Sequence, residues 1–119
     1  MISDGKFRKK EHILKSKDFM AVYRKGRSFK RSGVVMCCAP TALGHNRLGF
    51  SISSSVIKLA SLRNRLRRVF REIYRKRRAT MKSAFDIVFI VRRNPGKNIS
   101  YEWAESVYTA LVKEAGILA

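Results

Sequence analysis

The stretch from Leu62 to Arg78 reads LRNRLRRVFREIYRKRR and restricts the possible folds of this chain more than any other segment. Its apolar residues recur at i, i+4, i+7, i+8, i+11 and i+12, which places them along one side of an α-helix and does not fit the alternation of a strand. These residues are Leu62, Leu66, Val69, Phe70, Ile73 and Tyr74. Most of its arginines fall on or beside the opposite side. The stretch therefore predicts a helix that packs by its apolar face and exposes a dense row of cations.

The whole chain shares this positive charge. It has 119 residues, with 27 Lys and Arg against 8 Asp and Glu, so its formal net charge at pH 7 is +19. A charge of this size says little about the fold, but it predicts a polyanionic partner. A nucleic acid backbone fits a row of cations better than an anionic membrane surface or an acidic protein does.

A chain of this length is expected to form one domain, residues 1–119, with residues 1–15 as a partly mobile basic arm. No run approaches the roughly 18 apolar residues that a membrane-spanning helix needs. The N-terminus also lacks the apolar core of a secretory signal. Cys37 and Cys38 would point to opposite faces of a strand, so we expect no disulfide between them. These features predict a cytoplasmic protein with reduced thiols and no membrane partner, monomeric when free.

A shorter helix is predicted near the N-terminus. Ser16 is a candidate N-cap for this helix, and Gly26 is a candidate C-terminal stop. Phe19 and Tyr23 lie one turn apart on its same side. Either both rings lie in the core, or one face of the pair is open and stacks on nucleic acid bases.

Three segments are predicted to form strands. Residues 28–39 contain the apolar run Val34–Ala39, and Arg47–Ser53 alternates large apolar with small or polar residues. An antiparallel pairing of these two strands is the simplest topology. Phe85–Val91 is rich in β-branched and aromatic residues and predicts a central strand.

A final helix is predicted between a Ser100 cap and a Gly116 stop. With two or three strands before the basic helix, the pattern indicates an α+β fold, a two-layer sandwich in the order α-β-β-β-α-β-α. Its helices pack against one mixed sheet, and the basic helix connects two strands of that sheet.

No pattern predicts a catalytic or metal site in the chain itself. Glu72 and Asp86 fall on separate elements, and no Gly-rich phosphate loop is present. Clusters of Asp, Glu or His suited to a two-metal nuclease are also missing from the sequence. The serines at positions 51, 53, 54 and 55 have no local base. Glu72 is expected to act as a local counter-charge within the basic helix.

The basic stretch carries a specific pattern: Arg63-Asn64-Arg65, then Leu66-Arg67-Arg68, then Arg71-Glu72. This pattern resembles the signature of the bacterial ribonuclease P protein component. Further similarities stand in the same order on either side and cover nearly the whole chain. They are Lys17-Asp18-Phe19 with Val22-Tyr23, the strand Arg47–Ser53, the strand start Phe85–Val88, and the closing helix Tyr101–Leu118.

The resemblance implies a protein subunit that pairs with a catalytic RNA. That RNA, with Mg²⁺, would hydrolyse a phosphodiester in precursor tRNA and release the 5′ leader. The enzyme would then be the ribonucleoprotein, with Mg²⁺ bound through the RNA subunit and substrate and no catalytic residues in this chain. The resemblance also implies a left-handed βαβ crossover, an exception to the usual handedness.

Two sets of site residues follow from the resemblance. The basic helix would bind the catalytic RNA through Arg63, Asn64, Arg65, Arg67, Arg68 and Arg71. A cleft between the first helix and the sheet would hold the single-stranded leader, through Phe19, Tyr23, Arg47, Ser51 and Ser53. The main alternative is a non-catalytic ribosomal-type or general RNA-binding protein with a similar sandwich. A DNA-binding protein is a weaker alternative, because the helix lacks a helix-turn-helix partner.

Overall fold

The predicted order of elements is confirmed in the computed structural model, which describes residues 9–96 and 99–118. Two short 3₁₀ turns add to this order: Lys9–Glu11 precedes the first helix, and Arg78–Thr80 follows the second. The helices are α1 (Ser16–Lys25), α2 (Ala60–Arg77) and α3 (Tyr101–Ala115). The strands are β1 (Arg27–Arg31), β2 (Val34–Pro40), β3 (Arg47–Ser51) and β4 (Phe85–Val91).

The ends of the helices agree with the predicted signals in all but one case. The backbone N–H of Trp103 donates to the Ser100 hydroxyl (3.1 Å), and Gly116 ends α3 in the left-handed region at φ 72°. The predicted N-cap at Ser16 is wrong: Ser16 lies inside α1, and Lys15 stands at the cap position. α1 does end at Gly26.

The four strands form one mixed sheet in the order β1-β2-β4-β3. β1 and β2 are an antiparallel hairpin whose turn, Ser32–Gly33, has positive φ at both residues (51° and 80°). β4 pairs antiparallel with β2 and parallel with β3. The expected antiparallel pairing of β2 with β3 is therefore wrong, because β4 lies between them. The apolar β4 takes the central position that buries it on both faces.

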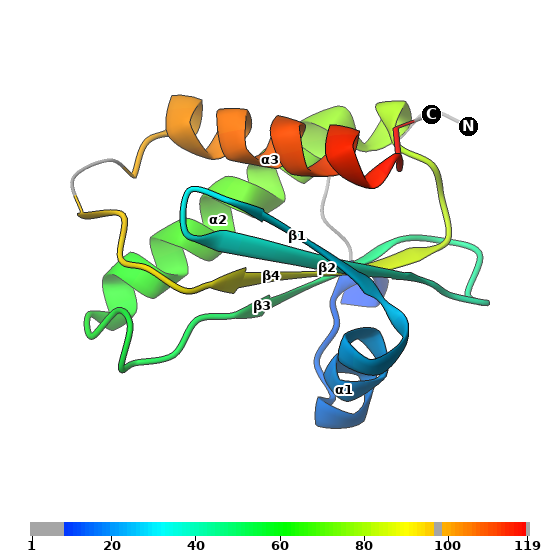
Figure 1. The fold of residues 1–119 in the computed structure, drawn as a ribbon, viewed down its shortest axis with the longest axis horizontal. Helices are drawn as coiled ribbons and strands as arrows, with labels where there is room; N and C mark the ends of the chain where they lie inside the picture. Colours follow the sequence, from blue (N-terminus) through cyan, green and yellow to red (C-terminus); the bar gives the residue numbers. More distant parts are fainter. Residues whose placement is uncertain (1–8, 97–98, 119) are drawn as a thin grey trace.

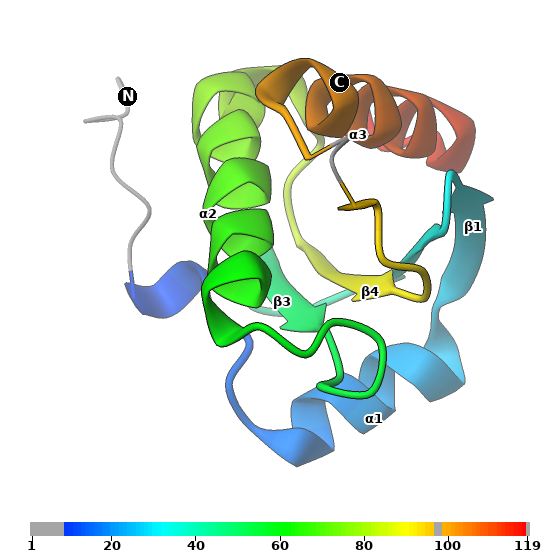
Figure 2. The same cartoon turned by 90° about the vertical axis from the view of Figure 1, so that its left-hand side faces the viewer.

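The parallel strands β3 and β4 are joined through α2. Figure 2 shows the ends of these strands facing the viewer, with the chain passing from β3 up through α2 and over to β4. This path has the left-handed sense that the resemblance implied. The crossover places the whole length of α2 on one face of the sheet.

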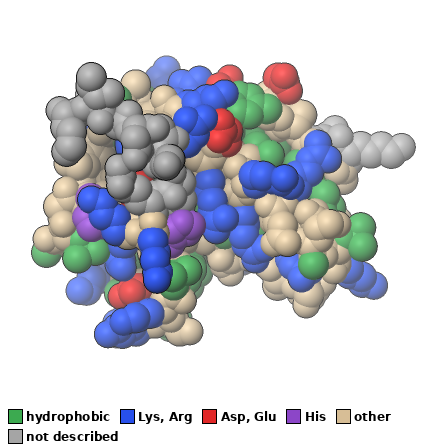
Figure 3. Space-filling model, turned by 180° about the vertical axis from the view of Figure 1, so that it is seen from behind, with side chains coloured by type: hydrophobic (Ala, Val, Ile, Leu, Met, Phe, Trp, Pro, Cys, Tyr) green, Lys and Arg blue, Asp and Glu red, His purple; other side chains and the backbone are tan. Residues whose placement is uncertain are grey.

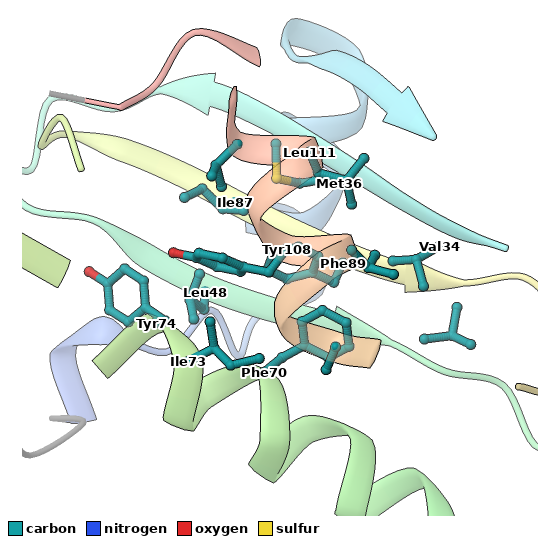
Figure 4. Packing of buried hydrophobic residues seen from close by; sticks show 14 of the residues in the cluster. Val34, Met36, Leu48, Phe70, Ile73, Tyr74, Ile87, Phe89, Tyr108 and Leu111 are labelled. Atoms are coloured by element: carbon teal, nitrogen blue, oxygen red, sulfur yellow. The ribbon is translucent and has the colours of Figure 1, made fainter. Parts of the chain in front are cut away.

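Helices cover both faces of the sheet, but unequally. Figure 1 shows α2 and α3 above the sheet and α1 beneath it. The main core lies between the sheet and the two upper helices, where Phe89 of β4 meets Phe70 of α2 (ring centroids 5.0 Å apart) and Tyr108 of α3 (6.0 Å) (Figure 4). A smaller apolar cluster lies under α1. The sandwich is confirmed, and α1 adds a partial third layer.

Part of the N-terminal segment contacts the rest of the domain. Residues 1–8 of the expected mobile arm lie outside the described residues. The backbone N–H of Ile13 donates to the Leu48 carbonyl (2.7 Å), and Glu11, 5% exposed, pairs with Arg78 (3.2 Å). Residues 11–13 of that segment therefore pack against the domain. Among the described residues, no helix combines the length and apolarity needed to cross a bilayer.

Candidate nucleic-acid interface

The apolar side of α2 is buried as predicted, through Leu66, Phe70, Ile73 and Tyr74. This burial fixes the rotation of the helix, so its polar side faces solvent. A shallow groove of about 360 Å³ runs along that side, which we call the arginine groove. It is lined by Asn64, Arg67, Arg68, Arg71, Glu72 and Arg75.

The arginine groove is ordered by contacts within α2 and to β3. Arg67 Nη1 donates to Asn64 Oδ1 (3.0 Å), and the Arg71 guanidinium lies over the Phe50 ring, 5.3 Å from its centroid. Burial, with the nearby charge of Arg67, lowers the pKa of Arg71 from its ordinary value. Arginine stays charged even so. These cations therefore repel one another, and an anion bound across them would relieve the repulsion.

Glu72 is the acidic residue of the arginine groove, and Arg75 binds it. Arg75 Nε donates to Glu72 Oε2 (3.1 Å), and this hydrogen bond lowers the pKa of the Glu72 carboxyl. Its predicted role as a local counter-charge is confirmed. Figure 3 shows one face of the molecule, on which Lys and Arg side chains far outnumber Asp and Glu. This electrostatic character suits the binding of a phosphate backbone.

Two predicted RNA contacts of α2, Arg63 and Arg65, also hold the fold together. Arg63 Nη1 donates to the carbonyls of Ile57 (2.7 Å) and Lys58 (3.0 Å), in the loop before the helix. Arg65 Nη2 donates to the Ile99 carbonyl (3.1 Å), just before α3. These backbone acceptors leave other guanidinium N–H groups available, because each guanidinium has five donors.

A second hollow, about 780 Å³, lies on the same face of the sheet as α1, beside the helix and over strands that the helix does not cover. We call it the sheet groove. The strand register aligns one row of its floor as Lys30, Val35, Ile90 and Ser51, one residue from each strand. The floor is therefore apolar in its centre and polar at both edges. Its full lining is Tyr23, Ser28, Lys30, Arg31, Ser32, Gly33, Val34, Val35, Cys37, Ser51, Ile90, Arg92 and Arg93.

The aromatic pair of α1 has two different environments. Phe19 is half-buried and its ring rests on β3, where a Cβ added to Gly49 would come within 2.8 Å of Phe19 Cε1. Tyr23 is 38% exposed and lines the sheet groove. The two ring centroids are 6.5 Å apart. Phe19 thus joins the smaller core, while Tyr23 presents an open face on which a base can stack.

The three other residues expected in the cleft separate. Ser51 lines the sheet groove. Ser53 lies beyond the end of β3, where its hydroxyl accepts from the Val56 N–H (3.3 Å). Arg47 lies outside the groove lining, and two carboxylates bind its guanidinium, those of Asp86 and Asp18. The structure therefore brings together Tyr23 and Ser51, with Phe19 beside them, and gives Arg47 and Ser53 structural contacts.

Sequence reasoning missed the cations at one end of the sheet groove. Lys30 and Arg31 come from the end of β1, and Arg92 and Arg93 directly follow β4. All four side chains are exposed. The signal that could have found Lys30 and Arg31 is the Ser32–Gly33 turn, which marks a hairpin. Because β4 runs antiparallel to β2, the C-terminal end of β4 lies beside this turn and brings Arg92 and Arg93 to the same end of the sheet. Within residues 9–96 and 99–118, no group of three or more His, Cys, Asp or Glu could hold a metal ion.

Comparison with known proteins identifies the family. A family model described as Ribonuclease P matches residues 7–116. The chain belongs to the ribonuclease P family. It is 35% identical to the ribonuclease P protein component of Syntrophomonas wolfei over 111 residues, which cover 93% of this chain and 92% of that protein. It is 38% identical to that of Clostridium botulinum over 110 residues, covering 92% and 97%.

Solved structures of ribonuclease P proteins have the same fold. The Staphylococcus aureus RNase P protein superposes with a TM-score of 0.81 at 28% identity, covering 92% of this chain and 98% of that one. The Thermotoga maritima RNase P protein shares the fold with a TM-score of 0.77 at 24% identity, covering 87% and 96%. The chain is therefore a protein subunit of ribonuclease P, a ribonucleoprotein of tRNA processing, and a general RNA-binding role is not favoured.

Proposed function

We propose that this chain binds the catalytic RNA of ribonuclease P through the arginine groove and the 5′ leader of precursor tRNA in the sheet groove. The observation that carries the proposal is the position of the two grooves. α2 packs on one face of the sheet, and the sheet groove opens on the other. A single domain could thus hold two RNA segments at once. We place this activity in the bacterial cytoplasm.

The arginine groove suits a folded RNA surface. Arg67, Arg68 and Arg71 offer planar guanidinium groups that can bind phosphate oxygens in pairs of hydrogen bonds. Asn64 adds an amide that can bind a base edge or a ribose. The dense cationic row favours backbone contact over base reading, so shape and charge would select the partner.

The sheet groove suits a single strand of varied sequence. Tyr23 can stack on a base without demanding its identity, and the apolar floor of Val35 and Ile90 can receive base or ribose surface. The cations at one end, including Arg31 and Arg92, can bind the phosphates. A tRNA-processing enzyme meets many leaders, so tolerance of sequence is the property that this site needs.

We assign bond breaking to the RNA subunit. Mg²⁺ needs oxygen ligands, and the described residues offer no cluster of carboxylates that fits it. The metal would therefore be bound through the RNA subunit and the substrate. This chain would contribute binding, orientation and charge neutralisation, because its cations offset the repulsion between catalytic RNA and substrate RNA.

Reconstitution tests this division of labour. The purified chain, mixed with a bacterial ribonuclease P RNA and a precursor tRNA at near-physiological Mg²⁺, should release the 5′ leader. The RNA alone should cleave poorly under the same conditions, and the chain alone should not cleave. Cleavage by nuclease-free protein without the RNA would contradict the assignment. So would a cleavage rate that is the same for the RNA alone and for the RNA with the chain.

A further inference from the structure

Arg47 connects α1 to the sheet. It is the first residue of β3 and pairs in register with Asp86 of β4. Its Nε donates to Asp86 Oδ1 (2.8 Å) and its Nη2 to Asp86 Oδ2 (2.7 Å), a bidentate pair. Its Nη1 reaches Asp18 Oδ2 of α1 (3.4 Å). The Arg47 and Asp86 side chains are 17% and 11% exposed, so this connection lies largely out of solvent.

Arg47 contacts its two carboxylates in different ways: Asp86 lies on the same sheet, whereas Asp18 comes from α1. Asp86 fixes the plane of the Arg47 guanidinium on the sheet, so little side-chain entropy remains to be lost when Asp18 binds it. An isolated, exposed ion pair would contribute little. Here a pre-oriented donor meets a carboxylate from another element, so the pair can determine where that element sits.

α1 has few other attachments that could set its position. Val22 is its fully buried residue, and the apolar cluster beneath the helix is small. Its C-terminal end is fixed by Gly26, where an added Cβ would lie 2.8 Å from the Cys38 carbonyl oxygen of β2. The N-terminal half depends on the Phe19 ring against Gly49 and on Asp18 against Arg47. Tyr23, which forms a wall of the sheet groove, lies between these two ends.

We propose that Arg47 is a positioning residue that sets α1 over the sheet through Asp18 and so sets the width of the sheet groove. The inference rests on the proposed function, because it concerns the binding of a single-stranded leader there. Loss of the Asp18 contact would let the N-terminal half of α1 shift. Tyr23 and the floor of the sheet groove would then bind a single RNA strand between them less tightly.

Replacing the Asp18 carboxylate by an amide of the same size distinguishes two models: Arg47 as a positioning residue and Arg47 as a direct RNA contact. Asp18→Asn removes the negative charge and leaves only a neutral amide oxygen as acceptor, so the contact of residue 18 with the Arg47 guanidinium weakens. If Arg47 bound phosphate directly, this variant would bind RNA more tightly. If Arg47 positions α1, it should bind leader-bearing tRNA more weakly, by about three- to tenfold. The two models therefore predict opposite signs.

The measurement compares precursor tRNA with mature tRNA on the reconstituted holoenzyme. Asp18→Asn should lower the affinity for precursor tRNA and leave the affinities for mature tRNA and for the catalytic RNA unchanged. Asp18→Glu, which keeps the carboxylate, should restore most of the lost affinity. Glu102→Gln removes an exposed charge on α3 and serves as the matched control, with both affinities unchanged or slightly raised.

Each outcome has a separate meaning. A wild-type holoenzyme that binds precursor and mature tRNA equally would overturn the proposed function. If the wild type prefers precursor tRNA and Asp18→Asn leaves that preference unchanged or increases it, only the positioning role of Arg47 is overturned and the proposed function stands. A parallel loss of affinity for the catalytic RNA would also overturn it, because the fold would then be damaged beyond α1.

Discussion

At the scale of single residues, the aromatic pair of α1 shows what spacing can predict. The interval between Phe19 and Tyr23 places both rings on one side of a helix. It does not tell which ring is open, because that depends on Gly49, a residue of a strand distant in sequence. Gly49 lacks a side chain at the point where the Phe19 ring contacts β3. Only the tertiary contact separates the packing ring from the open one.

Arg47 and Ser51 show the same limit. Both fall on one strand with alternation that predicts a shared face, and Ser51 does line the sheet groove. The partners of Arg47 are carboxylates from two other elements, Asp18 and Asp86. No local pattern identifies an ion pair of this kind, since its members are joined only by the fold.

Replacement of Tyr23 tests the stacking role. Tyr23→Ala should weaken the binding of precursor tRNA to the holoenzyme by ~1–3 kcal/mol, the usual value of a base–aromatic stack. Tyr23→Phe should retain most of this binding, because the ring remains. Phe19→Ala should show a similar loss together with a lower free energy of unfolding, since its ring packs on Gly49. An equal loss for mature and precursor tRNA in the Tyr23→Ala variant would exclude a leader-binding role.

At the scale of elements, the sequence predicts which segments form helices and strands better than it predicts their partners. β2 and β3 were each recognisable from their apolar patterns. Their order in the sheet was not, because the long crossover through α2 brings β4 between them. The hairpin of β1 with β2 was also partly hidden, since β1 is mostly exposed and carries a weak apolar signal.

α2 combines two functions that the sequence pattern does not separate. Its first turn holds no Asp or Glu, so the positive end of the helix dipole adds to the charge of its arginines. Arg63 satisfies carbonyls of the preceding loop, whereas Arg68 is exposed in the arginine groove. Residues of one type, five positions apart, therefore have different surroundings.

Paired alanine variants test this division. Arg68→Ala should lower the affinity for the catalytic RNA several-fold and leave the unfolding free energy unchanged, because the side chain is exposed. Arg63→Ala should lower the unfolding free energy by about 1–2 kcal/mol, because the Ile57 and Lys58 carbonyls lose a charged donor. Urea unfolding and RNA binding, measured on the same preparations, distinguish the two effects. A stable Arg63→Ala protein with the larger binding defect would reverse the assignment.

At the scale of the whole molecule, the cations far exceed the acids that could pair with them. Several acids pair with arginines: Glu11 with Arg78, Asp18 and Asp86 with Arg47, Glu72 with Arg75, and Glu105 with Arg77. The chain has 27 Lys and Arg but only 8 Asp and Glu, so a net charge of +19 is left for an anionic partner to neutralise. The total charge predicted a polyanion. It could not predict two separate grooves, one along α2 and one beside α1, which follow from how these helices pack.

Salt dependence can separate the ionic part of leader binding from the stacking part. Each phosphate bound by a cation releases counterions, so log affinity falls linearly with log salt, by about 0.7 per phosphate for a single strand. Arg92→Ala should therefore reduce the slope for precursor tRNA binding to the holoenzyme by about 0.7. Tyr23→Ala should weaken binding at every salt concentration without changing the slope, because a stacked ring releases no counterions. Equal slopes for the wild type and Arg92→Ala would show that the leader phosphates do not reach that end of the sheet groove.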